Sequence, residues 1–400
     1  MTIRITYLAT VIIAVLLIIA GYRFAVHGLV IFQDPLQELT TARVQRIVER
    51  IHPEDRFDFP DDFDVEDDFM PMMGEQIIFE AQVRSGPRRG QIITASQSMS
   101  RFIRAGSKEI APGDSVLLIS FNPGEWFFNG YVRTNKLIGL GILFVVCVVF
   151  FGGKKGFNTI LSLGLTCAAV FAVFIPSILS GKNIYLMAML VCAYTTIMTL
   201  LLVMGYSKKS LAAAIGCISG IVAAGLITLI MDRVLLLTGI VDEHSRFLAN
   251  LPIGTPINLK AIIFGGIIIG AMGAIMDVAM SISSALWEIK EKAGVIQFET
   301  LFRSGLNIGR DIMGSMANTL ILAYIGSSLS VVLILSVYSN SLLELLNREM
   351  IVVEILQALA GSFGILFALP LTAFFCAVIY LKKKSVDYTD FRKKSSPEAL

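Results

Sequence analysis

The sequence has few charged residues for its length: Asp, Glu, Lys and Arg make up 16% of its 400 residues. Hydrophobic residues make up 55%, and the mean hydropathy is +0.74. A soluble protein of this size cannot bury so much apolar surface, so part of the chain must be solvated by lipid. The composition therefore excludes an ordinary soluble protein and predicts an integral membrane protein.

Cysteine and histidine are also scarce, with five and three residues. All the cysteines fall in apolar stretches: Cys147, Cys167, Cys192, Cys217 and Cys376. The histidines, His27, His52 and His244, are widely separated. This pattern offers no disulfide framework and no Cys-based or His-ligated metal site. We therefore expect no metal and no cofactor.

Familiar catalytic and nucleotide-binding motifs are missing. The chain has no GxxxxGK[ST] loop, no GxSxG elbow, no HExxH helix and no CxxC pair. ATP-driven transport by this chain alone is therefore not expected. Nothing indicates an enzyme or a nucleic-acid partner, although a carboxylate inside the membrane could do acid–base work.

What the sequence does contain is long apolar runs. A helix needs about 20 apolar residues to cross the hydrocarbon core. Eight stretches qualify as spans: 7–22, 137–151, 157–179, 184–204, 211–231, 261–285, 312–338 and 351–381. The last is long enough to tilt or to be broken by Pro370. The first lacks a small-x-small cleavage site, so we interpret residues 1–23 as a retained anchor rather than a signal peptide.

Lys and Arg predict the orientation of these spans. With the N-terminus inside, fifteen of them lie in cytoplasmic segments and five in the short outer loops. Both termini are therefore expected in the cytoplasm, which requires an even number of spans. Residues 136–382 then form a seven-helix membrane domain, and the basic tail 383–400 is attracted to anionic lipid.

Residues 24–135 are expected to form a separate domain outside the cytoplasm. From Gln76 apolar and polar residues alternate, which places Ile77, Phe79, Ala81 and Val83 on one face of a strand. Further short strands are separated by Gly/Pro turns, which predicts a small all-β barrel, for instance of the OB type, or a sandwich. Thr41–Ile51 fits either a first strand or an amphipathic helix.

An acidic segment, residues 54–70, interrupts this domain and interleaves Asp and Glu with Phe. Such a segment could bind calcium or a basic partner. It lacks the Gly and the terminal Glu spacing of an EF-hand loop. A solvated loop whose aromatic residues touch the barrel or the membrane surface is the simpler interpretation.

The strongest chemical signal lies in the sixth span, 261–285. Gly266 and Gly270 form a small-xxx-small pair that favours close helix packing, and Gly273 follows. A carboxylate at mid-membrane costs about 2.5–3.5 kcal/mol on insertion scales, so Asp277 should face a partner or a watery cavity. Helical spacing places Ser281 and Ser284 on the face of Asp277.

The seventh span, 312–338, is preceded by Gly309, Arg310 and Asp311. Gly314, Ser315, Asn318, Thr319 and Tyr324 follow, and Asn318 lies about 10 Å deeper than Asp311 at 1.5 Å per residue. We expect Asp277, Ser281, Asp311, Asn318 and Thr319 to surround one polar cavity between the two spans. Alternatively, these residues only join helices through buried hydrogen bonds, with Arg310 neutralising a carboxylate.

The segment 287–309 joins these spans and is interpreted as a partly amphipathic cytoplasmic linker along the inner leaflet. It could also dock a protein partner in the cytoplasm. The outer β-domain is the other expected place for a protein partner.

The sequence also resembles a known family. The runs "GGIIIGAMGAIMDVAMSISSALWEI", "SGLNIGRDIMGSMANTLILAYIGSSL" and "GSFGILFALPLTAF" are similar to the YibE/YibF-like bacterial multi-pass membrane proteins. The resemblance implies residence in the bacterial cell membrane, a strand at Thr41–Ile51 and a permease role. Its motif positions are Asp277, Ser281, Glu288, Gly309, Arg310, Asp311, Gly314, Asn318, Thr319 and Pro370.

Two functions follow from these observations. In the first, the helices form a permease or secondary transporter of a small molecule or ion, with a polar site between the sixth and seventh spans. In the second, the chain is a membrane scaffold, or a sensory or assembly component, whose outer β-domain binds a partner.

Overall fold

The computed structural model describes residues 2–26, 38–51, 75–99, 108–122, 124–251, 256–339 and 341–381. The acidic segment 54–70 and the basic tail 383–400 lie outside these ranges. The chain forms two compact units. One is Val30–Cys147, and the other combines Met1–Leu29 with Val148–Leu400.

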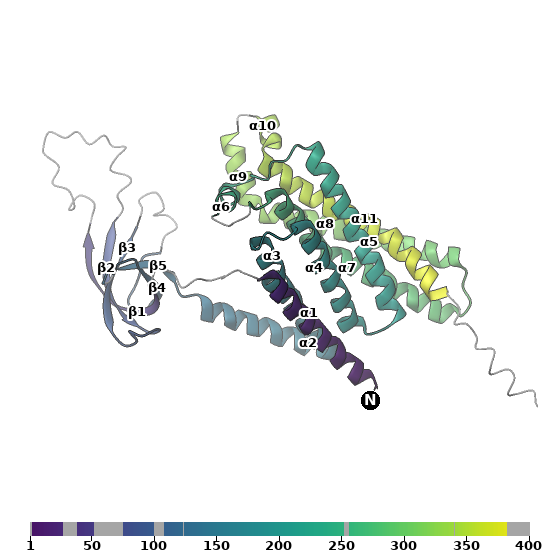
Figure 1. Ribbon diagram of the computed structural model, residues 1–400, viewed down its shortest axis with the longest axis horizontal. Helices are drawn as coiled ribbons and strands as arrows, with labels where there is room; N and C mark the ends of the chain where they lie inside the picture. The colour runs from purple at the N-terminus through teal and green to yellow at the C-terminus, as the bar shows by residue number, and fades with distance from the viewer. Residues whose placement is uncertain are drawn as a thin grey trace, which may run out of the picture. The chain divides into compact units, whose positions relative to one another are not determined.

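The first unit contains a closed barrel of five strands (Figure 1): β1 (Glu38–Ile51), β2 (Gln76–Val83), β3 (Ile92–Ser98), β4 (Ser115–Ser120) and β5 (Trp126–Tyr131). The order around the barrel is β1-β2-β3-β5-β4, and only the β3–β5 pair is parallel within the described strands. The predicted barrel between the first helix and the helical bundle is confirmed, and five strands fit the OB type. The structure also settles Thr41–Ile51 as part of a strand.

The barrel has its own apolar core. Ile77, Phe79 and Ala81 are fully buried and Val83 nearly so, as the alternation in β2 predicted. Register shifts in β1 after Val44 and after Ile47 bend this long strand, so that it pairs with both β2 and β4. The remaining core residues are Ala42, Val44, Ala95, Met99, Ile110, Val116, Leu118 and Trp126.

The second unit is helical: α1 (Thr2–Ala25), α2 (Thr134–Ala168, begun in the first unit), the π-helix η4 (Ala169–Phe174), α3 (Ile175–Leu179), α4 (Ile184–Met204), α5 (Lys208–Val234), α6 (Glu243–Ala249), α7 (Leu259–Ala293), α8 (Phe298–Ser327), α9 (Leu329–Tyr338), α10 (Leu342–Asn347) and α11 (Glu349–Leu381). In Figure 1, α5 and α11 run side by side along the bundle. Capping side chains begin several of these helices, as Asn183 does at α4 and Asn258 does at α7.

Glycines bring the central helices of the bundle into close contact. A Cβ at Gly220 of α5 would lie 2.6 Å from Cβ of Ala368 in α11 and 2.9 Å from a methyl group of Ile275 in α7. At Gly364 of α11 it would lie 2.6 Å from Ile275. This close packing of small residues is typical of membrane helices.

Six described helices are long and apolar enough to cross a membrane, or seven if α8 and α9, bent by 60°, form one span. The sequence predicted eight, because it divided residues 134–179 into two spans. The structure assigns α2 across both, but Gly153 inside it has non-helical backbone angles (φ 53°, ψ −131°). A Cβ at Gly156 would collide with the carbonyl oxygen of Val148, whereas eight residues of straight helix rise about 12 Å. The chain therefore bends sharply where the sequence separates its second and third spans.

The structure also bears on two other segments of the chain. Pro370 does not break the last span, which is one helix from Glu349 to Leu381 with the proline inside it. The expected linker 287–309 is almost entirely helical, because α7 continues to Ala293 and α8 begins at Phe298. Residues 294–297 separate the two helices.

Candidate functional site

One stripe of exposed residues runs along α7. Its members are small or polar and follow one another at intervals of three and four: Gly266, Gly270, Gly273, Asp277, Ser281, Ser284 and Glu288. This spacing keeps them on one helical face. At 1.5 Å per residue the stripe is about 33 Å long, close to the thickness of the hydrocarbon core. We refer to these seven residues as the α7 stripe.

The other side of α7 explains why the stripe is exposed. Ile268, Ile275 and Ile282 are buried there and are spaced seven residues apart. Ile275 packs between Gly220 and Gly364, and Leu286 lies 2.9 Å from the Cβ position of Gly305. The apolar face thus anchors α7 in the bundle, which turns the stripe away from the core.

Asp277 lies near the middle of this stripe without a partner. Within the described residues, neither it nor Ser281 nor Ser284 makes a side-chain hydrogen bond, and Asp277 makes no ion pair. An unpaired carboxylate in contact with lipid is unfavourable. An ionised Asp277 would therefore be stabilised by water, an ion or another polar group against this face.

The polar residues predicted on the seventh span lie on α8, and all except Tyr324 are also exposed. Ser315 donates to the carbonyl oxygen of Ile312 at 3.0 Å, and Thr319 donates to that of Ser315 at 2.8 Å. Asp311 and Asn318 have no side-chain partner among the described residues. Arg310 donates to Asn307 at 3.4 Å, so it does not neutralise a carboxylate as expected.

The expected cavity shared by both spans remains a prediction. Within the described residues no hydrogen bond or ion pair joins the Asp277 group to the Asp311 group. The physical reason is the packing of α8, which buries Leu301, Gly305, Gly309 and Leu320 against its neighbours. Asp311 is offset from Gly309 by about 200° around the helix, so it points away from this packed face.

Tyr324 is the predicted residue that connects α8 to the stripe. A Cβ at Gly270 would lie 2.5 Å from the hydroxyl oxygen of Tyr324 and 3.8 Å from the amide nitrogen of Gln357 in α11. The Tyr324 hydroxyl is buried and has no hydrogen-bond partner among the described residues. Sequence reasoning missed Gln357, although an amide inside the apolar run of α11 was a signal for it.

The glycines expected to mediate helix packing divide into two groups. A Cβ at Gly309 would collide with the side chain of Leu369 in α11, so this glycine does bring two helices together. At Gly266, Gly273 and Gly314 a Cβ would meet nothing within 4 Å in the part of the chain that is described. These three glycines lie on the exposed faces of α7 and α8 and pack against no other described helix.

At the cytoplasmic end predicted for α7, Glu288 completes the stripe. It accepts a hydrogen bond from Lys292 at 2.7 Å, one turn further along the helix. This pair is exposed and contributes little to stability. It leaves Asp277 as the stripe's single unpaired carboxylate among the described residues.

Comparison with protein families gives one match. The family described as YibE/F-like protein matches residues 140–382, more than half of the chain and all of the stripe. Neither the curated proteins nor the solved structures contain a match to this sequence.

Proposed function

The chain belongs to the YibE/F-like protein family, and on that premise we propose that it is a permease or secondary transporter whose path follows the α7 stripe. The solute is a small polar molecule or ion. The unpaired carboxylate of Asp277 favours a cation or a proton as the transported or coupled species.

One observation supports this proposal above the others. A helix face that meets lipid is normally apolar, yet the stripe is small or polar over about 33 Å. Its glycines expose backbone, and its serines expose hydroxyl groups that form no side-chain hydrogen bond with any described residue. A face of this kind is suited to water and a solute.

The distribution of Lys and Arg predicts which end of the path faces the cytoplasm. With both termini in the cytoplasm of a bacterial cell, α7 enters from outside at Leu259 and ends inside at Ala293. Asp277 then lies about 12 Å from Ala285, the inner end of the predicted span. The hydroxyl of Tyr324 lies beside the outer half of the path, at Gly270.

The same stripe could instead pack against a helix of a second copy, because small residues also favour helix association. That alternative corresponds to a scaffold rather than a transporter. The two differ in what the charge of Asp277 does. A helix contact depends on shape, whereas a cation path depends on charge.

The experiment replaces Asp277 by Asn in full-length protein reconstituted in liposomes. Imposed H⁺, Na⁺ and K⁺ gradients are the probes, and flux is followed with ion-sensitive dyes. We expect Asp277→Asn to lose at least about 90% of the protein-dependent flux, because one transition-state interaction is commonly worth tenfold or more. Ser281→Ala should give a smaller loss on the same face.

Two controls make the result interpretable. The variants must remain monodisperse with unchanged helix content, which separates lost flux from lost fold. Asp311→Asn removes the same charge from a face that does not join the stripe, and it should retain most of the flux. Flux equal to that of the unchanged protein in Asp277→Asn would overturn the proposal, and an equal loss in Asp311→Asn would add α8 to the path.

A further inference from the structure

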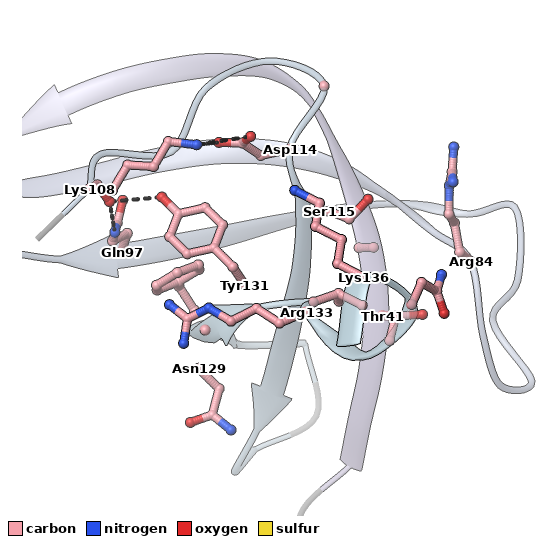
Figure 2. Close-up of a pocket in the computed structure, with 16 residues that line it drawn as sticks. Thr41, Arg84, Gln97, Lys108, Asp114, Ser115, Asn129, Tyr131, Arg133 and Lys136 are labelled. Atoms are coloured by element: carbon pink, nitrogen blue, oxygen red, sulfur yellow. Dashed lines mark hydrogen bonds and ion pairs between the residues drawn. The ribbon is translucent and has the colours of Figure 1, made fainter. Parts of the chain in front are cut away.

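The barrel contains a pocket of about 930 Å³ that the membrane path does not use. Figure 2 shows that its walls come from β1, β4 and β5 and from the segment that leads into α2. Thr41 and Ser115 lie on two paired strands, and Tyr131 ends β5. Asn135 and Lys136 belong to the first turn of α2. All of the lining residues belong to the barrel unit.

The pocket is strongly cationic. Arg84, Lys108, Arg133 and Lys136 line it, and Asp114 is the single carboxylate among its described lining residues. Lys108 pairs with Asp114 at 3.1 Å. The other three cations have no ion-pair partner among the described residues. Unpaired cations around a concave surface attract an anion.

Several contacts connect the residues at the floor of the pocket. Tyr131 donates to the carbonyl oxygen of Lys108 at 2.7 Å, and Gln97 donates to the same oxygen at 3.2 Å. Partial burial raises the pKa of the Tyr131 hydroxyl, so it remains a neutral donor. The Lys108 ammonium lies 4.9 Å from the centre of the Tyr131 ring. These contacts hold Lys108 and Tyr131 in place before any ligand arrives.

Arg133 and Lys136 reach the pocket from either side of Tyr131. In Figure 2, Lys136 extends toward Ser115 and Asp114, whereas Arg133 extends toward Asn129. Arg84 stands at the opposite rim. The N-terminus of α2 adds the positive end of a helix dipole at the same place. Arginine, lysine and a helix N-terminus are together the usual partners of phosphate oxygens.

The position of Lys136 in the sequence bears on the source of the ligand. The apolar run of α2 begins with the next residue, Leu137, and continues through Phe151. Lys136 therefore marks the boundary between the hydrocarbon core and the polar region, which is where phospholipid phosphates lie.

We propose that this pocket binds an anionic phosphate group, held by Arg133 and Lys136 with Arg84 at the rim. The phosphate belongs either to the headgroup of an anionic phospholipid or to a soluble phosphate compound. Asp114 keeps Lys108 oriented and limits the positive charge of the pocket.

The experiment uses the full-length protein and the double variant Arg133→Gln/Lys136→Gln. Arg89→Gln is the matched control, because Arg89 is an exposed cation of the same barrel outside the pocket. In one arm, inorganic phosphate and pyrophosphate are titrated against detergent-solubilised protein by calorimetry. In the other, nanodiscs of phosphatidylcholine with phosphatidylglycerol are used, and the lipids retained by the protein are measured by native mass spectrometry.

We expect the double variant to weaken binding by about tenfold or more in one arm, while Arg89→Gln changes it less than about twofold. A loss in the first arm identifies a soluble phosphate, and a loss in the second identifies a lipid headgroup. The proposal is overturned if neither arm shows binding, or if Arg89→Gln causes an equal loss.

Discussion

The barrel and the helical bundle differ in which of their described charged groups lack a partner. In the barrel several carboxylates have cationic partners: Glu80 accepts two hydrogen bonds from Arg46, and Asp114 accepts a hydrogen bond from Lys108. In the bundle Asp277 has no partner among the described residues, although pairing would matter far more in a membrane. The unpaired charges also differ in sign: Asp277 is an anion, whereas the described residues of the barrel pocket include cations without an ion-pair partner. Both proposals, the membrane path and the phosphate pocket, rest on these unpaired charges.

The largest expected effect concerns topology and is all-or-none. If the bend at Gly153 turns α2 into two spans, Lys182 lies on the same side of the membrane as the barrel. Single cysteines at Glu125 and Lys182 in a cysteine-free background should then both react with an impermeant thiol reagent on intact cells. A cysteine at Lys208 should react only after permeabilisation. Reaction at Glu125 without reaction at Lys182 would show that residues 134–179 cross once.

The next effect tests whether the barrel has an independent core. Phe79→Ala removes a fully buried aromatic side chain and should destabilise the barrel by about 3–5 kcal/mol. Ile92→Ala, at a side chain that is 56% exposed, should change stability by less than about 1 kcal/mol. Denaturant unfolding of the full chain can be followed through Trp126 with Trp287 replaced by Phe. Equal effects of the two substitutions would contradict the core assignment.

A smaller effect separates the two faces of α8. Gly309→Ala places a methyl group against Leu369 and should cost about 1–3 kcal/mol, because the helices must move apart. Gly314→Ala adds the same group in open space and should gain up to about 1 kcal/mol from helix propensity. Unfolding in sodium dodecyl sulfate measures both. A loss at Gly314 as large as at Gly309 would place a partner on the exposed face.

The smallest effect is a pH dependence in the barrel. Although partial burial opposes it, hydrogen bonds from the Ala111 backbone and Lys108 hold the pKa of Asp114 below its usual range. As the pH falls, Asp114 is therefore protonated at a higher pH in the unfolded chain than in the folded barrel. The contribution of ionised Asp114 to barrel stability is present above about pH 4 and is lost as the pH falls further. Because the pair is partly exposed, we expect less than about 1 kcal/mol. Asp114→Asn should weaken the pH dependence of the barrel's thermal unfolding midpoint between about pH 5 and 2. An unchanged pH dependence would contradict this account.

The sequence correctly predicted the helices and strands whose apolar or polar residues recur with a strong period. The alternation from Ile77 to Val83 identified the buried face of β2, and the spacing of Asp277, Ser281 and Ser284 identified one face of α7. Both patterns are local, so neither required knowledge of the rest of the fold. Family resemblance added the strand at Thr41–Ile51.

What the sequence missed depends on distant contacts. Polar residues on α8 suggested a face toward α7, but Gly305 and Gly309 determine the packed side because Ala373 and Leu369 fit against them. The pocket cations Arg84, Lys108 and Arg133 lie on separate segments that only barrel closure brings together. No periodicity in a single segment could have revealed either arrangement.

The most direct test asks what lies against the α7 stripe. Single cysteines at Ser281 and Ser284 are compared with one at Leu190, whose side chain is 53% exposed on the apolar helix α4. All three are treated with a small hydrophilic thiol reagent in the membrane. A water-filled path predicts rapid reaction at Ser281 and Ser284 and almost none at Leu190. Slow reaction at all three sites, or disulfide cross-links between copies through Ser281→Cys, would contradict the transport path.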